Sequence, residues 1–170
     1  MIQKCSLLKV LEVFFVEPTT IHFIRRISKE IKLAATSVRN NIKMLLKEKL
    51  IVEKKSEPFN GYVANRDSKE FTFLKKAYNF STLFELKEFI EDSVHPLAIV
   101  LFGSYSRGED VESSDIDILI LSKVKKDIDF NNFQKRLKRN INAMIIDNLN
   151  KLDDAMRKKI NNGVILSGEI

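Results

Sequence analysis

The stretch LAIVLFGSYSRGEDVESSDIDILIL, residues 97–121, decides the fold of the C-terminal half of this chain. It opens with a continuous apolar run, residues 97–102, which predicts a buried strand. Gly103 and Ser104 end this run and lead into a short helix, and residues 113–121 predict a second strand. Two buried strands this close in sequence indicate a small sheet that needs helices to cover it.

The residues at the end of the first strand favour phosphate binding. Gly103 lets the backbone approach a ligand without a Cβ atom in the way. Free backbone N–H groups at such a turn, together with the hydroxyl of Ser104, can donate hydrogen bonds to phosphate oxygens. The turn therefore predicts a binding site for a phosphorylated ligand.

The second strand carries two carboxylates that point in the same direction. Residues two apart in a strand share a face, so Asp115 and Asp117 lie side by side while Ile116 and Ile118 take the buried face. Two adjacent carboxylates repel unless a cation holds them, and Mg²⁺ binds through one or two carboxylates together with phosphate oxygens. We expect Mg²⁺ at Asp115 and Asp117.

Gly-Ser followed ten residues later by Asp-x-Asp resembles the nucleotidyltransferase superfamily of polymerase-β type. The forms GSYSRG and SDIDILIL are similar to the minimal nucleotidyltransferases of prokaryotes, and the resemblance covers residues 81–170, including the closing segment INNGVILSGE. It implies that Asp115 and Asp117 are the catalytic and metal-binding residues. It further implies nucleotide binding by four loop residues: Gly103, Ser104, Arg107 and Gly108.

One position departs from that family. A third acidic residue usually stands on a later strand, here predicted over residues 141–146, and the matching position is Asn142. Asn140 shares its face, whereas Asp147 has the opposite parity and comes late. An amide offers no negative charge and cannot act as a base. We therefore expect good binding of a nucleoside triphosphate with slow or absent transfer.

The N-terminal half predicts three helices, residues 3–16, 20–31 and 36–49, with Thr20 and Thr36 or Ser37 as N-caps. A β-hairpin with an Asn60-Gly61 turn follows over residues 50–65. This order resembles a winged-helix DNA-binding domain covering residues 1–66; the alternative is a dimerisation or protein-binding module. The residues expected to meet duplex DNA are Ser37, Arg39, Asn40, Lys43, Lys54 and Lys55.

The charge distribution agrees with two modules that have different partners. Residues 1–80 carry 16 Lys and Arg against 8 Asp and Glu, and residues 81–170 carry 13 against 15. The basic half is a candidate for binding a polyanion. A helical connector is expected over residues 67–80, and Ser81 or Thr82 is the expected cap of the next helix. No apolar run is long enough to cross a membrane, and a single cysteine fits the reducing cytoplasm.

Two further patterns are weaker. Asp127 and Asp129 repeat the Asp-x-Asp spacing, but they precede a helix predicted over residues 130–139 and are expected to cap it. The basic run Lys135–Arg139 predicts a solvated helix face; contact with a nucleotide or nucleic acid is the alternative.

The sequence thus predicts an α+β chain: an N-terminal winged helix-turn-helix, then a nucleotidyltransferase-type mixed β-sheet flanked by helices. The leading function is Mg²⁺-dependent transfer of a nucleoside monophosphate from an NTP to a protein or RNA acceptor. The alternatives are a nucleotide-sensing transcription regulator and a non-catalytic antitoxin with a degenerate site. The resemblance suggests a helical toxin-like protein partner; the sequence leaves open whether the chain forms a homodimer.

Overall fold

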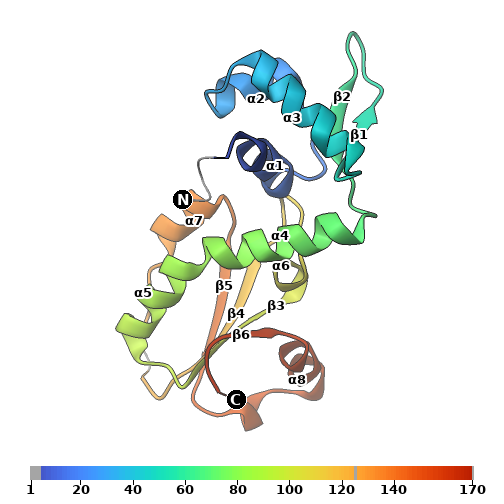
Figure 1. Cartoon of the computed structure of the whole chain (residues 1–170). Coiled ribbons are helices and arrows are strands. Elements are labelled where there is room, and N and C mark those ends of the chain that lie inside the picture. The colour runs from blue at the N-terminus through green and yellow to red at the C-terminus, as the bar shows by residue number, and fades with distance from the viewer. Residues whose placement is uncertain (1–4, 125, 170) are drawn as a thin grey trace. The chain divides into compact units, whose positions relative to one another are not determined.

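The computed structural model describes residues 5–124 and 126–169, and the chain divides into two compact units, residues 1–75 and 76–170 (Figure 1). The division falls within one helix, α4 (Lys69–Thr82), between Lys75 and Lys76. No helix in these described ranges is both long and apolar enough to cross a membrane.

In its described residues the first unit contains three helices, a two-stranded antiparallel hairpin and the beginning of α4. Its elements are α1 (Ser6–Val16), α2 (Ile24–Glu30), α3 (Ala35–Lys47), β1 (Ile51–Lys54) and β2 (Gly61–Ala64). The helices pack their apolar stripes together, and the buried side chains include Phe14, Phe15, Ile27, Ile42 and Leu45. The predicted helix order and the hairpin are therefore present.

The turn of the hairpin is not where the sequence indicated. Gly61 pairs with Lys54 as the first residue of β2, so residues 55–60 make the turn. Gly61 serves a close approach instead, since a Cβ atom there would lie 2.3 Å from Ile21 Cγ2. The neighbouring segment forms a β-bridge to the hairpin: the backbone N–H of His22 donates to Tyr62 O at 2.7 Å, and the N–H of Tyr62 donates to His22 O at 2.8 Å.

The predicted N-caps are also wrong. Helix α2 begins after Phe23 and not after Thr20, and α3 begins after Ala34, ahead of Thr36 and Ser37. Neither Phe23 nor Ala34 makes a side-chain capping bond. Residues 21–23 are extended because His22 joins the hairpin, and this tertiary bridge overrides the local capping preference of Thr20.

The second unit is a four-stranded mixed sheet with helices on both faces. Beyond α4 its elements are α5 (Phe84–Val94), β3 (Ala98–Phe102), α6 (Gly103–Arg107), β4 (Ile116–Leu121), α7 (Asn131–Leu137), β5 (Ile141–Ile146), the 3-10 helix η2 (Leu149–Lys151), α8 (Asp154–Asn161) and β6 (Val164–Gly168). The strand order is β5-β4-β3-β6; β4 and β5 are parallel and the other pairs are antiparallel. Helix α5 follows Leu83, so Ser81 and Thr82 do not cap it.

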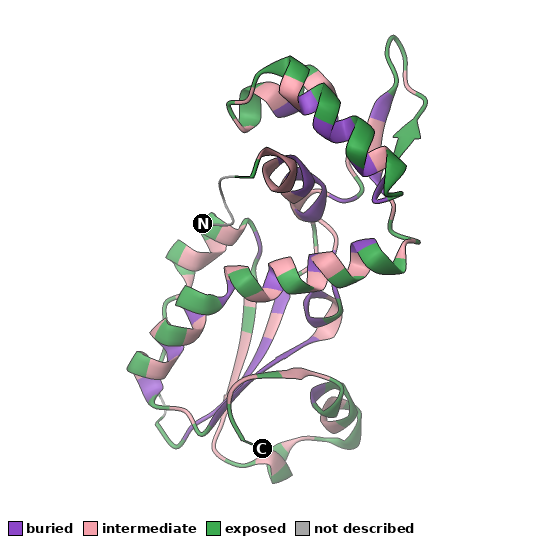
Figure 2. Cartoon of the chain, in the orientation of Figure 1, coloured by how far each residue is buried: buried purple, intermediate pink, exposed green. Residues whose placement is uncertain are grey.

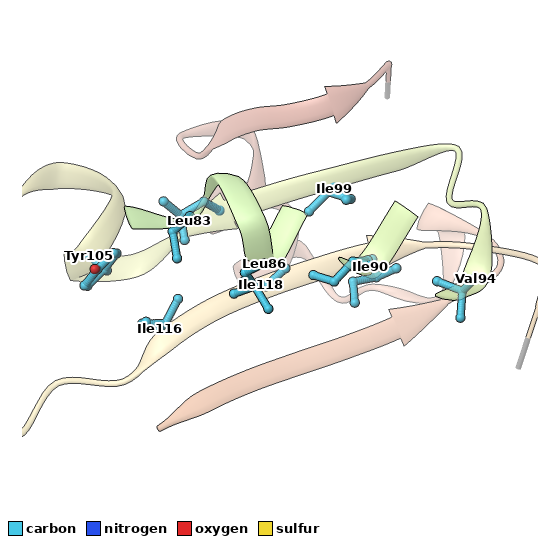
Figure 3. Close-up of a cluster of buried hydrophobic side chains, with 10 residues drawn as sticks. Leu83, Leu86, Ile90, Val94, Ile99, Tyr105, Ile116 and Ile118 are labelled. Atoms are coloured by element: carbon cyan, nitrogen blue, oxygen red, sulfur yellow. The ribbon is translucent and has the colours of Figure 1, made fainter. Parts of the chain in front are cut away.

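The two faces of the sheet have separate cores. The central strands β3 and β4 are mostly buried, as the purple segments of Figure 2 show. On one face α5 packs through Leu86 and Ile90 against Ile116 and Ile118 of β4, as Figure 3 shows. On the other face Ile160 of α8 joins a cluster containing Val100, Phe102 and Leu119. Since side chains alternate along a strand, Asp117 belongs to the same face as Leu119, away from α5.

Candidate nucleotide-binding site

Gly103, the first residue after β3, lies next to the carboxylate of Asp117. Phe102, the last residue of β3, pairs with Asp117 of β4, so the turn into α6 lies against this carboxylate. A Cβ atom on residue 103 would lie 2.4 Å from Asp117 Oδ2, closer than non-bonded atoms approach. Residue 103 also has a φ of +76°, which side chains rarely tolerate. Both observations require glycine at this position.

Helix α6 begins at Gly103, so the N–H groups of its first turn have no partner within the helix. The hydroxyl of Ser104 has no hydrogen-bond partner among residues 5–124 and 126–169, so it can donate to a ligand. Gly108 ends the helix in the left-handed region, at φ +72°, and its N–H bonds to the carbonyls of Ser104 and Tyr105. Arg107 is exposed and its Nε lies 2.7 Å from Glu109 Oε2, so a phosphate would have to compete with this surface ion pair.

Asp115 and Asp117 occupy alternate positions at the start of β4. Asp115 is exposed, one residue ahead of the strand, and Asp117 is half-buried within it. Neither carboxylate has an ion pair with a Lys, Arg or His in the described part of the chain. Two neighbouring carboxylates without a cationic partner are the donor set that a hard divalent cation prefers.

Asn142 lies directly beside Asp117. The two residues are partners in the parallel β4–β5 pairing, and Asn142 Nδ2 donates to Asp117 Oδ1 at 3.1 Å. The expected position of the third family residue thus coincides with an amide that is turned toward the carboxylate. Asn140, two residues earlier, is exposed, and its carbonyl accepts from Ile116 N at 2.8 Å.

Asp147 is at the other end of the sheet. It follows the last residue of β5, five residues beyond Asn142, which corresponds to about 16 Å along a strand. Its carboxylate forms an ion pair with Lys151 at 2.6 Å. Asp147 is therefore too far away to complete a cation site with Asp115 and Asp117.

The available donors fit one magnesium ion with phosphate oxygens as further ligands. Asp115 and Asp117 would hold it, and Gly103 leaves the space beside Asp117 Oδ2 unfilled. Within the described residues no three His, Cys, Asp or Glu side chains gather as a group that could hold a metal. At the position where the family resemblance implies a third carboxylate, this chain has Asn142.

Sequence reasoning missed a buried polar cluster behind this site. Asp110 and Arg139 form an ion pair at 3.7 Å with almost no exposed side-chain area, and Asn79 Nδ2 donates to Asp110 Oδ1 at 2.8 Å. Arg139 is therefore not part of a solvated helix face, as the basic run had indicated. No local pattern could have revealed the cluster, because its members come from α4, the α6–β4 loop and the turn between α7 and β5. It fixes that loop between the two strands of the site.

Tyr105 of α6 has a structural role in the same region. Its hydroxyl lies 3.0 Å from Thr82 Oγ1, and burial raises the pKa of Tyr105 to about 12. The phenol therefore stays protonated at neutral pH and does not act as a base. Asp129 precedes α7 and accepts from Asn131 N at 2.9 Å, but the N-cap of this helix is Phe130, so neither Asp127 nor Asp129 is the capping residue that the sequence indicated.

A second candidate site lies in the first unit, on the outward face of α3. Arg39, Asn40 and Lys43 are exposed, and Ser37 is half-buried at the start of the helix. The helix contains no acidic residue. Lys54 and Lys55 are exposed at the end of β1.

In this small mixed sheet the first strand ends in Gly-Ser, next to the Asp117 carboxylate of the neighbouring strand. Residues 85–169 match the family described as Polymerase beta, Nucleotidyltransferase. The match covers half of the 170 residues, and the chain belongs to this nucleotidyltransferase family. No curated protein and no solved structure matches the chain.

Proposed function

We propose that the second unit binds an NTP through one Mg²⁺ at Asp115 and Asp117 and transfers its nucleoside monophosphate to an acceptor hydroxyl. The observation that carries the proposal is the contact between Gly103 and the Asp117 carboxylate at the start of α6. The contact lies at the first turn of α6, next to Ser104, and this supports phosphate binding by the turn and metal binding by the carboxylate at one point. Family membership supports the same activity.

In the proposed reaction the acceptor oxygen forms a bond to the α-phosphorus, and the bond between the α-phosphorus and the bridging oxygen breaks. Pyrophosphate leaves with that electron pair, and the hydroxyl proton passes to water. When bound, Mg²⁺ neutralises charge on the phosphates. Gly103 and Ser104 orient the β- and γ-phosphates, and Asp115 and Asp117 place the NTP relative to the acceptor.

Asn142 makes this transfer slow. Its Nδ2 donates to Asp117 Oδ1, so the side of the site that faces the acceptor presents an amide group instead of a third carboxylate. The acceptor hydroxyl then has no anionic neighbour that could take its proton or hold a second metal ion. NTP binding does not need that group and is retained.

Radiolabelled NTP and Mg²⁺ test the proposal in two variants. Asn142→Asp should increase the rate of pyrophosphate release at least tenfold, by an order-of-magnitude estimate for a positioned carboxylate base. Asn161→Asp, a control with the same substitution at an exposed position of α8, should change the rate by less than about twofold because α8 carries none of the proposed site residues. Equal rates in all three proteins would contradict the assigned role of Asn142.

If the unaltered protein binds NTP but transfers nothing, the site acts as a nucleotide sensor or as a non-catalytic antitoxin. Purification of the chain with its bound partner, followed by mass spectrometry, distinguishes these outcomes. A nucleotide added to the partner supports transfer, whereas an unmodified helical toxin-like partner supports action by binding alone.

We also propose that the first unit is a winged-helix module that binds duplex DNA, with α3 as its recognition helix. Two observations favour it: the basic outward face of α3, and the bridge between His22 and Tyr62 that adds a third segment to the hairpin. Arg39, Asn40 and Lys43 would face base edges, and Lys54 and Lys55 would meet phosphates.

Fluorescence anisotropy with labelled duplexes tests the DNA proposal. The affinity should fall with salt by a log–log slope of about −0.9 per phosphate contact. Arg39→Ala should reduce the preference for one sequence, whereas Lys55→Ala should weaken binding to all sequences alike. No binding at low salt would assign the unit to dimerisation or protein binding.

A further inference from the structure

Asn79 of α4 joins two segments of the nucleotide site through one buried amide group. Its Nδ2 donates to Tyr105 O, in α6, at 2.9 Å and to Asp110 Oδ1, in the α6–β4 loop, at 2.8 Å. The side chain is buried, so both bonds are shielded from water. Helix α6 carries Ser104 and the loop leads to Asp115, so a single side chain ties the proposed phosphate-binding turn to the proposed metal-binding strand.

Asp110 extends this connection to a third segment. Its Oδ2 lies 3.7 Å from Nη2 of Arg139, and the two side chains are 1% and 5% exposed. Arg139 belongs to the turn between α7 and β5, three residues ahead of Asn142. The carbonyl of the next residue, Asn140, accepts from Ile116 N at 2.8 Å, where the pairing of β4 with β5 begins. The ion pair therefore joins the two segments that lead into these strands.

Asn79, Asp110 and Arg139, the buried polar cluster, are better suited to fixing positions than to adding stability. The free energy lost when a carboxylate and a guanidinium leave water is comparable to what their attraction returns, and apolar side chains of similar volume often support a fold equally well. A buried polar group must, however, meet its partner at the right distance and angle, so a satisfied cluster permits one arrangement of the segments that it joins.

We propose that the buried polar cluster positions the nucleotide site. It holds the starts of α6, β4 and β5 at the separation that an NTP with its Mg²⁺ requires, and it acts through Ser104 and Asp115. Groups that orient metal ligands from behind change metal affinity by about 10- to 100-fold when they are removed. This inference rests on the proposed NTP binding and names the buried residues on which the affinity depends.

Two variants of the full-length protein test the cluster by independent routes. Asp110→Val/Arg139→Met replaces the ion pair by apolar side chains of similar total volume. The midpoint of thermal unfolding should stay within about 4 °C of that of the unaltered protein, whereas the affinity for ATP·Mg²⁺ should fall about tenfold or more. Asn79→Ala removes both amide bonds and should lower the midpoint and the affinity together. Calorimetric titration is done at a temperature where each variant is folded.

Ser122→Ala is the matched control for loss of a buried hydrogen bond in the same unit. The hydroxyl of Ser122 is buried beyond the opposite end of β4 and donates to Val94 O at 2.7 Å. Its removal should lower the midpoint of unfolding as Asn79→Ala does, because each substitution takes away a buried donor. The affinity for ATP·Mg²⁺ should change by less than about twofold, since no proposed site residue lies at that end of the strand.

The outcomes separate this inference from the proposed function. A loss of ATP·Mg²⁺ affinity in the cluster variants and not in Ser122→Ala supports the positioning role. If the unaltered protein binds ATP·Mg²⁺ and a folded cluster variant binds it equally well, the inference is overturned while the proposed function stands. An equal loss in Ser122→Ala would also overturn it, because the effect would then follow from lower stability alone. Failure of the unaltered protein to bind ATP·Mg²⁺ would overturn the proposed function, and this inference with it.

Discussion

The two oxygen atoms of the Asp117 carboxylate have different surroundings. We call the side of Oδ2, next to Gly103, the nucleotide edge, and the side of Oδ1, next to Asn142, the acceptor edge. On one edge, Oδ2 lies against the Cα of Gly103 and the start of α6, an arrangement that tolerates no side chain at residue 103. On the other edge, Oδ1 accepts a hydrogen bond from an exposed asparagine of β5. Under the proposed function, this difference means that the group needed for transfer lies on β5, apart from the β3–α6 turn and β4 that would hold the nucleotide, so the two requirements can be altered independently.

The largest expected effect is the loss of ATP affinity when both carboxylates of the proposed metal site are removed. Asp115→Asn/Asp117→Asn should weaken Mg²⁺-dependent ATP binding by at least about 100-fold, because the cation loses both charged ligands. The thermal unfolding profile should stay nearly normal, since neither side chain is buried. Calorimetric titration with ATP·Mg²⁺ measures the affinity, and an unchanged value would eliminate the metal site.

Gly103→Ala tests the nucleotide edge alone. The added methyl group meets Asp117 Oδ2 in a left-handed backbone conformation, so we expect a loss of about 1–3 kcal/mol in stability together with weaker ATP binding. Gly61→Ala is the matched control, because its Cβ collides with Ile21 in the first unit and should leave ATP binding intact. Chemical denaturation and ATP titration of both variants would reveal a purely structural glycine if ATP affinity fell equally in the two.

Asp147→Asn tests the acceptor edge. Its ion pair with Lys151 lies at the far end of β5, so the rate of pyrophosphate release should change by less than about twofold, as expected for a surface pair of under ~1 kcal/mol. The rate is measured beside Asn142→Asp under the same conditions. Transfer that is lost in Asp147→Asn but insensitive to residue 142 would show that the third ligand has been placed wrongly.

The smallest effect concerns the framework behind both edges. Glu91 of α5 accepts hydrogen bonds from Lys87, at 2.7 Å, and from Ser167 of β6, and these bonds lower the pKa of its carboxyl below the ordinary value of 4.5. A carboxyl with a lowered folded-state pKa stabilises the fold above pH 4.5 and loses this contribution as the pH falls through the folded-state value.

Glu91→Gln should therefore be less stable than the unaltered protein at pH 7, by under about 1 kcal/mol for so exposed a pair, and the difference should shrink below pH 4.5. Thermal unfolding between pH 3 and 7 measures this. A stability difference that does not vary with pH would assign the effect to packing.

The sequence predicted those parts of the site that depend on strand periodicity. The strand at residues 141–146 lies where it was expected, and Asn142 stands beside Asp117 as the family resemblance implied. Strands alternate their side chains strictly, so a buried run followed by Asp-x-Asp determines which residues share a face.

What the sequence did not predict depends on distant partners. Thr20 has the side chain of a good N-cap, yet the bridge from His22 to Tyr62 keeps its neighbours extended. Arg139 belongs to a basic run, yet Asp110 draws it into the interior. In both cases a contact across about 30 residues or more outweighs a local preference, and a single sequence does not show such a contact.

The exposure of residue 142 has an evolutionary consequence. Asparagine and aspartate have the same shape, their codons differ by one base, and no packed neighbour of the exposed Asn142 would have to move. Under the proposed function, a single base change that replaces Asn142 by Asp would therefore convert a protein that only binds a nucleotide into one that transfers it. The reverse change needs one base as well, and neither direction requires an unfolded intermediate.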